Sequence, residues 1–127
     1  MRLELVPLSV SDVDRSITFY RDVVGFVLDH DVSPGHGMRV VQLTPPGSSC
    51  SISFGVGMGA GAPVSNLHLV VDDLDSVRAG LAANGLDVSP VQDMGGGVRY
   101  AFFADPDGNS WALQEISAGA ALPDPAS

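Results

Sequence analysis

The side chains that could carry out chemistry are few in this sequence, and their types exclude several reactions. All six basic residues are arginines, and there are three histidines and one cysteine. Without lysine, Schiff-base catalysis and a lysine-based phosphate loop are excluded. Cys50 falls on the apolar face of a predicted strand, which favours an inert core thiol. We expect His30 and His36 to be solvated, which leaves His68, within a predicted strand, as the candidate general acid or base.

The charge balance narrows the possible partners. The formal net charge is −9, which argues against nucleic acid and would attract a cationic ligand. No apolar run approaches the ~18 residues that cross a bilayer, and Met1-Arg2 leads into a predicted strand without a hydrophobic signal segment. We therefore expect a soluble, cytoplasmic protein with neither nucleic-acid nor membrane partners.

The stretch Asp105–Ile116 shows best how the chain would position such groups. Residues 105–109, with the sequence Asp-Pro-Asp-Gly-Asn, are typical of a tight turn. Beyond it, Trp111 and Leu113 alternate with smaller or polar residues, as in a strand with two different faces. The same pattern occurs 61 residues earlier, where Gly47 matches Gly108 and Ile52 matches Leu113. This spacing indicates an internal repeat.

Each half of the repeat predicts the order β-α-β-β-β. Asp12 and Asp73 are good caps for the two helices, and Pro7 favours an edge or seam for the first strand because it cannot donate to a ladder. The expected strands are residues 3–10, 26–32, 38–44 and 50–54, then 65–71, 86–91, 98–104 and 110–116. We predict one domain over 1–116, with module one at 3–55, a linker at 56–64 and module two at 65–116. Residues 117–127 are expected to form a flexible tail without a catalytic role.

Two motifs resemble the glyoxalase, bleomycin-resistance and extradiol-dioxygenase (vicinal oxygen chelate) superfamily. They are Asp14-Arg15-Ser16 with Phe19-Tyr20-Arg21-Asp22 and Gly25-Phe26, and the turn 105–109. The resemblance implies an α+β fold in which paired β-α-β-β-β modules form curled mixed sheets around a cavity. Because dimerisation would cover open strand edges and an apolar lining, we expect a homodimer with two equivalent cavities.

Enzymes of this superfamily usually hold a divalent metal with His or Glu from the first and last strand of each module. Carried over by the repeat, the four ligand positions are Leu5, Ser51, Asn66 and Ala112. Leucine and alanine offer no donor atom, and serine and asparagine are poor substitutes. Glu4 and Glu115 are one residue out of phase and therefore face the other way. We predict no metal site and no cofactor.

In phase with those four positions, a few polar groups would lie on an apolar wall, as in a small-molecule site. The candidate ligand contacts are Leu5, Pro7, Ser9, Ser51, Ser53, Asn66, His68 and Gln114. Arg99 and Phe103 join this set because they are in phase with Gln42 of the aligned strand, although sequence leaves open which side of residues 98–104 faces the cavity. Core packing is the commoner use of aromatic residues.

The sequence therefore predicts a member of this superfamily that binds a small organic molecule, cationic or aromatic, in a cavity between modules and without the usual metal. Such a protein would act in sequestration or resistance. One alternative is a metal-independent isomerase or lyase that uses His68 as general acid or base. A second alternative, which the sequence favours less, is a metal-dependent glyoxalase or dioxygenase-type enzyme with unusual ligands.

Overall fold

The computed structural model describes residues 1–56 and 61–116, and these form two compact units. The first unit comprises Met1–Ser65 and the turn Ala104–Asn109, and the second comprises Asn66–Phe103 and the segment that begins at Ser110. The turn belongs with the first unit although it lies late in the sequence, and so does Ser65, which was predicted to begin module two. That the two modules act as one domain stays a prediction, and the predicted tail lies outside the described residues.

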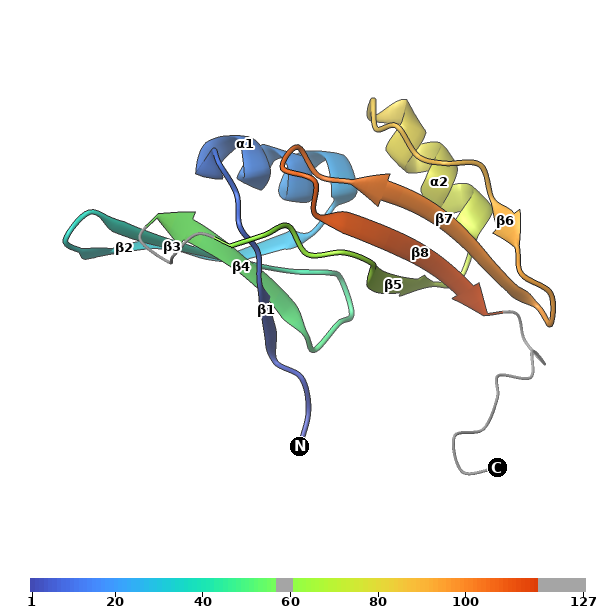
Figure 1. Ribbon diagram of the computed structural model, residues 1–127, viewed down its shortest axis with the longest axis horizontal. Coiled ribbons are helices and arrows are strands. Elements are labelled where there is room, and N and C mark those ends of the chain that lie inside the picture. The colour runs from blue at the N-terminus through green and yellow to red at the C-terminus, as the bar shows by residue number, and fades with distance from the viewer. Residues whose placement is uncertain (57–60, 117–127) are drawn as a thin grey trace. The chain divides into compact units, whose positions relative to one another are not determined.

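The first unit is a four-stranded sheet with a helical segment. Its elements are β1 (Leu5–Pro7), α1 (Val13–Ile17), η1 (Thr18–Val24), β2 (Val27–Gly35), β3 (Met38–Thr44) and β4 (Ser51–Val56). The strand order is β1-β4-β3-β2, with β1 parallel to β4 and the other neighbours antiparallel (Figure 1). Pro7 thus lies in an edge strand, as predicted, where its missing N–H removes no ladder bond.

The second unit repeats this plan. Its elements are β5 (Leu67–Val71), α2 (Leu74–Ala83), β6 (Gln92–Asp93), β7 (Val98–Ala104) and β8 (Ser110–Ile116). The strand order β5-β8-β7-β6 matches that of the first unit, again with a parallel first pair. The β-α-β-β-β order predicted for each half is confirmed.

Both helices begin as the sequence predicts. The side chain of Asp12 accepts a hydrogen bond from Arg15 N at 3.1 Å, and that of Asp73 accepts one from Ser76 N at 3.1 Å. Such caps satisfy backbone donors that have no partner within the helix. The first helix then widens into the π-helix η1, which the apolar spacing does not reveal. It ends at Gly25, whose φ of 96° is readily adopted by glycine.

The strand predicted over residues 86–91 is wrong, because the short β6 begins only at Gln92. Proline at position 90 cannot donate to a ladder. The segment makes one backbone hydrogen bond to β7, from Ser89 N to Phe102 O at 2.9 Å. Side chains add to it, since Arg78 Nε donates to Ser89 O at 2.7 Å and Ser89 Oγ accepts from Phe102 N at 2.8 Å. Strand β1 is likewise shorter than the predicted range 3–10.

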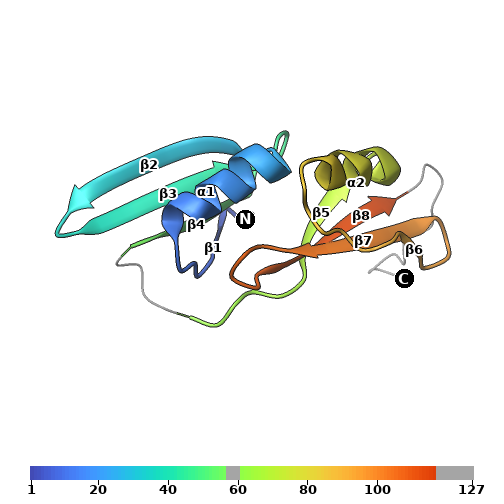
Figure 2. The ribbon, with the colours of Figure 1, turned by 90° about the horizontal axis from the view of Figure 1, so that it is seen from above.

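In each unit the helical segment packs on one face of the sheet (Figure 2). In the first unit the buried side chains on this face include Tyr20, Leu43 and Phe54, and Tyr20 stacks on Phe26 with ring centroids 5.6 Å apart. In the second unit Trp111 and Leu113 are buried, and the Trp111 ring lies parallel to that of Phe103. Trp111 and Leu113 therefore lie in the core as predicted, although Ala112 between them is also buried.

Candidate ligand-binding faces

Each sheet has a second face that the helix of its unit does not cover, which we call the open face. On the first sheet, strand pairing places Leu5 beside Ser51, Pro7 beside Ser53 and Ser53 beside Gln42 on this face. On the second sheet, the open face carries His68, Val70, Tyr100, Phe102, Ala112 and Gln114. Ser51, Ser53 and Ala112 are buried in the described structure. The more accessible polar residues on these faces could orient a ligand, and the accessible apolar ones could contact its body.

A continuous row of polar side chains crosses the first open face. Thr44 Oγ1 donates to the carboxylate of Asp29, Ser51 Oγ lies 2.7 Å from Thr44 Oγ1, and Gln42 Nε2 lies 3.4 Å from Ser51 Oγ. Because a carboxylate can only accept, the single hydroxyl hydrogen of Thr44 points to Asp29. Ser51 must then donate to Thr44, and Gln42 to Ser51. We call these four residues the Asp29 row.

Asp29 and Thr44 were missed by the sequence analysis, and a bulge explains why. The pairing of β2 with β3 shifts between Leu28, opposite Leu43, and His30, opposite Gln42. Asp29 is the extra residue, so strict alternation fails at this point. A bulge re-aims side chains in this way and is frequent beside functional sites. The polar run Asp29-His30-Asp31, between Leu28 and Val32, was the only available signal.

The second open face carries an aromatic shelf formed by His68, Tyr100 and Phe102. The rings of Tyr100 and Phe102 are parallel within 6°, with centroids 6.0 Å apart, and His68 meets Tyr100 edge-on at 5.9 Å. Gln114 Nε2 donates to the Tyr100 hydroxyl at 2.9 Å. This resolves the parity of β7 that the sequence left open, since Tyr100 and Phe102 are the residues on the open face.

Arg99 and Phe103, put forward from sequence as ligand contacts, lie on the helix-covered face instead. Phe103 is only 4% exposed and packs against Trp111. Arg99 forms ion pairs with Asp75 and Glu115, both at 2.9 Å. The hydrogen bonds that Arg99 donates to these two carboxylates raise the pKa of Arg99 above its ordinary value. The charges of its partners and the packing of Phe103 therefore fix this orientation of β7.

The ring of His68 is oriented by a hydrogen bond to the backbone rather than to another side chain. Its Nδ1 lies 2.7 Å from the carbonyl oxygen of Asn66, and since a carbonyl can only accept, Nδ1 carries the hydrogen. In the neutral form of the ring, the other nitrogen, Nε2, then bears a lone pair and can accept a hydrogen bond or a proton. Asn66 itself has φ of 58° and its N–H donates to Ser110 Oγ at 2.8 Å.

The four positions at which the superfamily carries metal ligands do not fit a metal. Leu5 and Ser51 are paired, but the equivalent partner of Ala112 is His68 and not Asn66, a shift of two residues between the modules. The 61-residue offset therefore aligns the two module sequences but not their strand registers. Leucine and alanine have no donor atom. Within residues 1–56 and 61–116, no group of three or more His, Cys, Asp or Glu side chains could hold a metal ion.

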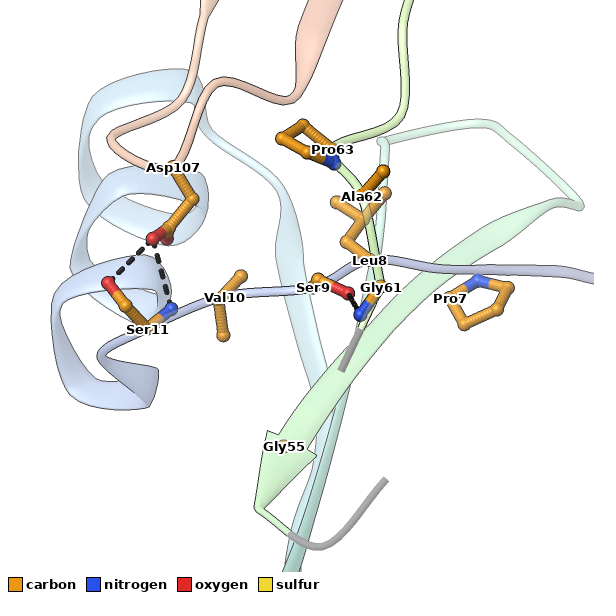
Figure 3. Close-up of a pocket in the computed structure, with 10 residues that line it drawn as sticks. All are labelled: Pro7, Leu8, Ser9, Val10, Ser11, Gly55, Gly61, Ala62, Pro63 and Asp107. Carbon is orange, nitrogen blue, oxygen red and sulfur yellow. Dashed lines mark hydrogen bonds between the residues drawn. The ribbon is translucent and has the colours of Figure 1, made fainter. Parts of the chain in front are cut away.

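A cavity of about 580 Å³ opens in the first unit where the chain leaves β1 (Figure 3). Ser9 Oγ faces it and accepts a hydrogen bond from Gly61 N at 2.9 Å, and Asp107 Oδ1 accepts from Ser11 N and Ser11 Oγ. The lining residues are Pro7, Leu8, Ser9, Val10, Ser11, Gly55, Gly61, Ala62, Pro63 and Asp107. Of the predicted contacts, Pro7 and Ser9 thus line one cavity. Ser53 is buried in the sheet, and its Oγ has no hydrogen-bond partner among the described residues.

The chain belongs to the glyoxalase/bleomycin resistance protein/dioxygenase superfamily, whose family model matches residues 2–113. It is similar to TnmS3, an antibiotic binding protein from Streptomyces sp. CB03234, with 32% identity, a TM-score of 0.80, and coverage of 92% of this chain and 97% of that one. A superfamily member from Sphaerobacter thermophilus DSM 20745 is 27% identical, with a TM-score of 0.79 and coverage of 91% and 97%.

A glyoxalase/bleomycin resistance protein from Streptomyces sp. CB03234 is also 32% identical, with a TM-score of 0.74 and coverage of 88% of this chain and 98% of that one. No curated protein matches the chain. Among the described residues, no helix is long and apolar enough to cross a membrane. The similarity to these three solved structures agrees with the two-module fold described above.

Proposed function

We propose that this protein binds a small organic molecule at its open faces without a divalent metal, and so acts in sequestration or resistance. The aromatic shelf on the second open face is the observation that carries this proposal. Its rings lie on the side of the sheet away from the helix, whereas the apolar core of the unit lies on the other side. The similarity to an antibiotic binding protein supports the same conclusion.

The shelf is suited to the flat body of an aromatic ligand. Tyr100 and Phe102 present two parallel rings and are only half-buried, and the neighbouring Val70 is 65% exposed. Aromatic rings contribute large contact areas and favour stacked or edge-on partners. Gln114 and Nε2 of His68 supply the few polar groups that orient a ligand on an apolar wall. The net charge of −9 favours ligands that carry a positive charge.

We expect Tyr100→Ala and Phe102→Ala each to weaken binding of acridine, a planar aromatic probe, by roughly two- to tenfold, as the loss of one aromatic contact implies. Fluorescence titration measures this affinity, and melting temperatures show whether the variants fold. Met94→Ala is the matched control, because Met94 is 63% exposed in the same unit and outside the shelf. Equal affinities in wild type and both shelf variants would contradict the proposal.

Treatment with a metal chelator is expected to change neither the stability of the protein nor its affinity for the probe. The positions Leu5, Ser51, Asn66 and Ala112 offer no set of ligands for a transition metal, so treatment with EDTA should leave the melting temperature and probe affinity of tag-free protein unaltered. Metal analysis of the purified protein is the direct measurement. Stoichiometric Zn, Ni, Mn or Fe that is lost in His68→Ala together with activity would establish the metal-dependent alternative instead.

The geometry of His68 favours a second candidate function, that of a metal-independent isomerase or lyase. With Nδ1 bonded to Asn66 O, Nε2 is available to accept a proton from a bound substrate. Turnover of a substrate by metal-free protein would support this alternative. His68→Gln should then abolish turnover while binding persists, whereas a binding protein shows no turnover in either form.

We also propose that the protein is a homodimer, since several large apolar side chains, including Leu5, Val27 and Val32, are exposed in the single chain. Burial of such residues against a second copy would remove apolar surface from water. Light scattering at micromolar concentration should give twice the mass of the chain, 13.1 kDa. A monomer under these conditions would contradict the proposed dimer.

A further inference from the structure

We infer that the hydroxyl group of Tyr100 selects the ligand of the second open face, and that it favours flat aromatic molecules that carry a carbonyl oxygen. This inference rests on the proposed function and adds the class of ligand to it. The residues on which it depends, Tyr100, Phe102 and Gln114, all belong to the second unit and to its neighbouring strands β7 and β8.

The hydrogen bond between Gln114 and Tyr100 determines what the hydroxyl group can offer a ligand. Gln114 Nε2 donates to Tyr100 Oη at 2.9 Å, so the tyrosine oxygen is the acceptor of this bond. A phenol group also has one hydrogen of its own to donate. No residue within 1–56 or 61–116 accepts that hydrogen. The hydroxyl group of Tyr100 is therefore a donor that a bound molecule can use.

Strand geometry places this donor beside the surface that a flat ligand would cover. Tyr100 and Phe102 alternate with the buried residues Ala101 and Phe103, so both of their side chains project from the open face. The two rings are parallel within 6°. Because the hydroxyl group is at the end of the tyrosine ring farthest from the backbone, the donor lies at the edge of the aromatic shelf.

The cost of covering the hydroxyl group provides the selectivity. Tyr100 is only half-buried, so water can accept its hydrogen in the free protein. A ligand that covers the shelf displaces this water, and a ligand without an acceptor leaves the donor unsatisfied, which costs binding free energy. A carbonyl oxygen conjugated with an aromatic ring is the simplest acceptor of this kind, because it has two lone pairs and carries no hydrogen.

The test compares fluorenone with fluorene, two flat tricyclic molecules that differ only in a carbonyl group in place of a CH₂ group. Displacement of acridine from the protein, followed by fluorescence at slightly alkaline pH, gives both affinities. Their ratio removes the contribution of the shared aromatic body. Tyr100→Phe keeps the ring and removes the hydroxyl group, so we expect it to lower the ratio of fluorenone affinity to fluorene affinity roughly two- to tenfold.

A second variant, Gln114→Glu, tests the direction of the hydrogen bond. A carboxylate can only accept, so it takes the hydrogen of Tyr100 away from the ligand, and the affinity ratio should fall although the tyrosine is intact. The matched control is Met94→Glu, which adds the same charge at an exposed residue of the second unit outside the shelf. It should leave the ratio unchanged. Melting temperatures show whether each variant folds.

The outcomes separate this inference from the proposed function. An unchanged ratio in Tyr100→Phe contradicts the inference, and it leaves the proposed function standing when wild-type protein binds acridine. A ratio that falls in Tyr100→Phe but not in Gln114→Glu also contradicts it, since Gln114 then does not direct the hydroxyl hydrogen. An equal fall in Met94→Glu would show that the added charge alone lowers the ratio, which contradicts the role of Gln114 as well. Wild-type protein that binds none of the three molecules contradicts both proposals.

Discussion

Asp105→Ala is expected to lower the free energy of unfolding by about 4 kcal/mol, because it leaves several buried donors without an acceptor. Asp105 is 5% exposed, and its carboxylate accepts four hydrogen bonds. Two come from side chains, Tyr20 Oη at 2.7 Å and Asn109 Nδ2 at 2.8 Å, and two come from the backbone N–H groups of Asp107 and Asn109, both at 2.9 Å.

These bonds connect distant parts of the first unit. Tyr20 lies in η1 and is fully buried, and Asn109 also donates to Ser9 O and accepts from Val64 N. The Asp-Pro-Asp-Gly-Asn turn therefore does more than reverse the chain. Its first carboxylate binds η1 through Tyr20 and positions Asn109, which in turn binds the segment after β1 and the linker. Removal of the carboxylate should loosen all three.

Chemical or thermal unfolding of Asp105→Ala measures the effect, with two companion variants. Tyr20→Phe removes one of the four donors together with its need for a partner and should cost about 1–2 kcal/mol. Asp93→Ala is the matched control, since Asp93 also accepts a backbone N–H in a turn, from Gly95 at 2.8 Å, but is exposed. It should cost less than about 1 kcal/mol. Equal stability of the Asp105 and Asp93 variants would show that burial of the carboxylate does not matter.

Glu115→Ala should destabilise the second unit by about 2–3 kcal/mol, since Glu115 is largely buried and serves two partners. Its Oε2 accepts a hydrogen bond from Leu74 N at 2.7 Å, at the first residue of α2, and its Oε1 binds Arg99 at 2.9 Å. A carboxylate at a helix N-terminus is also favoured by the helix dipole. The substitution leaves the Leu74 N–H without its acceptor and Arg99 with Asp75 alone.

The matched control uses the other partner of the same arginine. Asp75 binds Arg99 at the same distance, but its side chain is 69% exposed, so Asp75→Ala should cost less than about 1 kcal/mol. Glu115→Gln keeps an acceptor for Leu74 N and should lie between the two. Denaturant unfolding gives all three values. If both alanine variants lose the same stability, Glu115 acts only as a surface ion pair.

The sequence predicted those features that depend on neighbouring residues. The bounds of β3, β7 and β8 are as expected, and Asp12 and Asp73 cap the helices. Turn residues, capping groups and period-two alternation all act over a few positions, so they can be recognised in a single chain. The repeat and the superfamily motifs then gave the order of elements, because each module uses these same local signals.

The candidate site depended on choices that no local signal makes. Alternation divides β7 into two sets of side chains, but Arg99 faces the helix because Glu115 and Asp75 lie there, and those partners are distant in sequence. Asp29 joins the open face through a bulge, which breaks the alternation on which sequence reasoning relies. Sequence by itself thus determined the order of elements in the modules and showed neither His nor Glu at the four positions carried over from the superfamily. The tertiary structure decided which residues share a face, because pairing across strands and ion pairing with remote carboxylates set strand orientation and register.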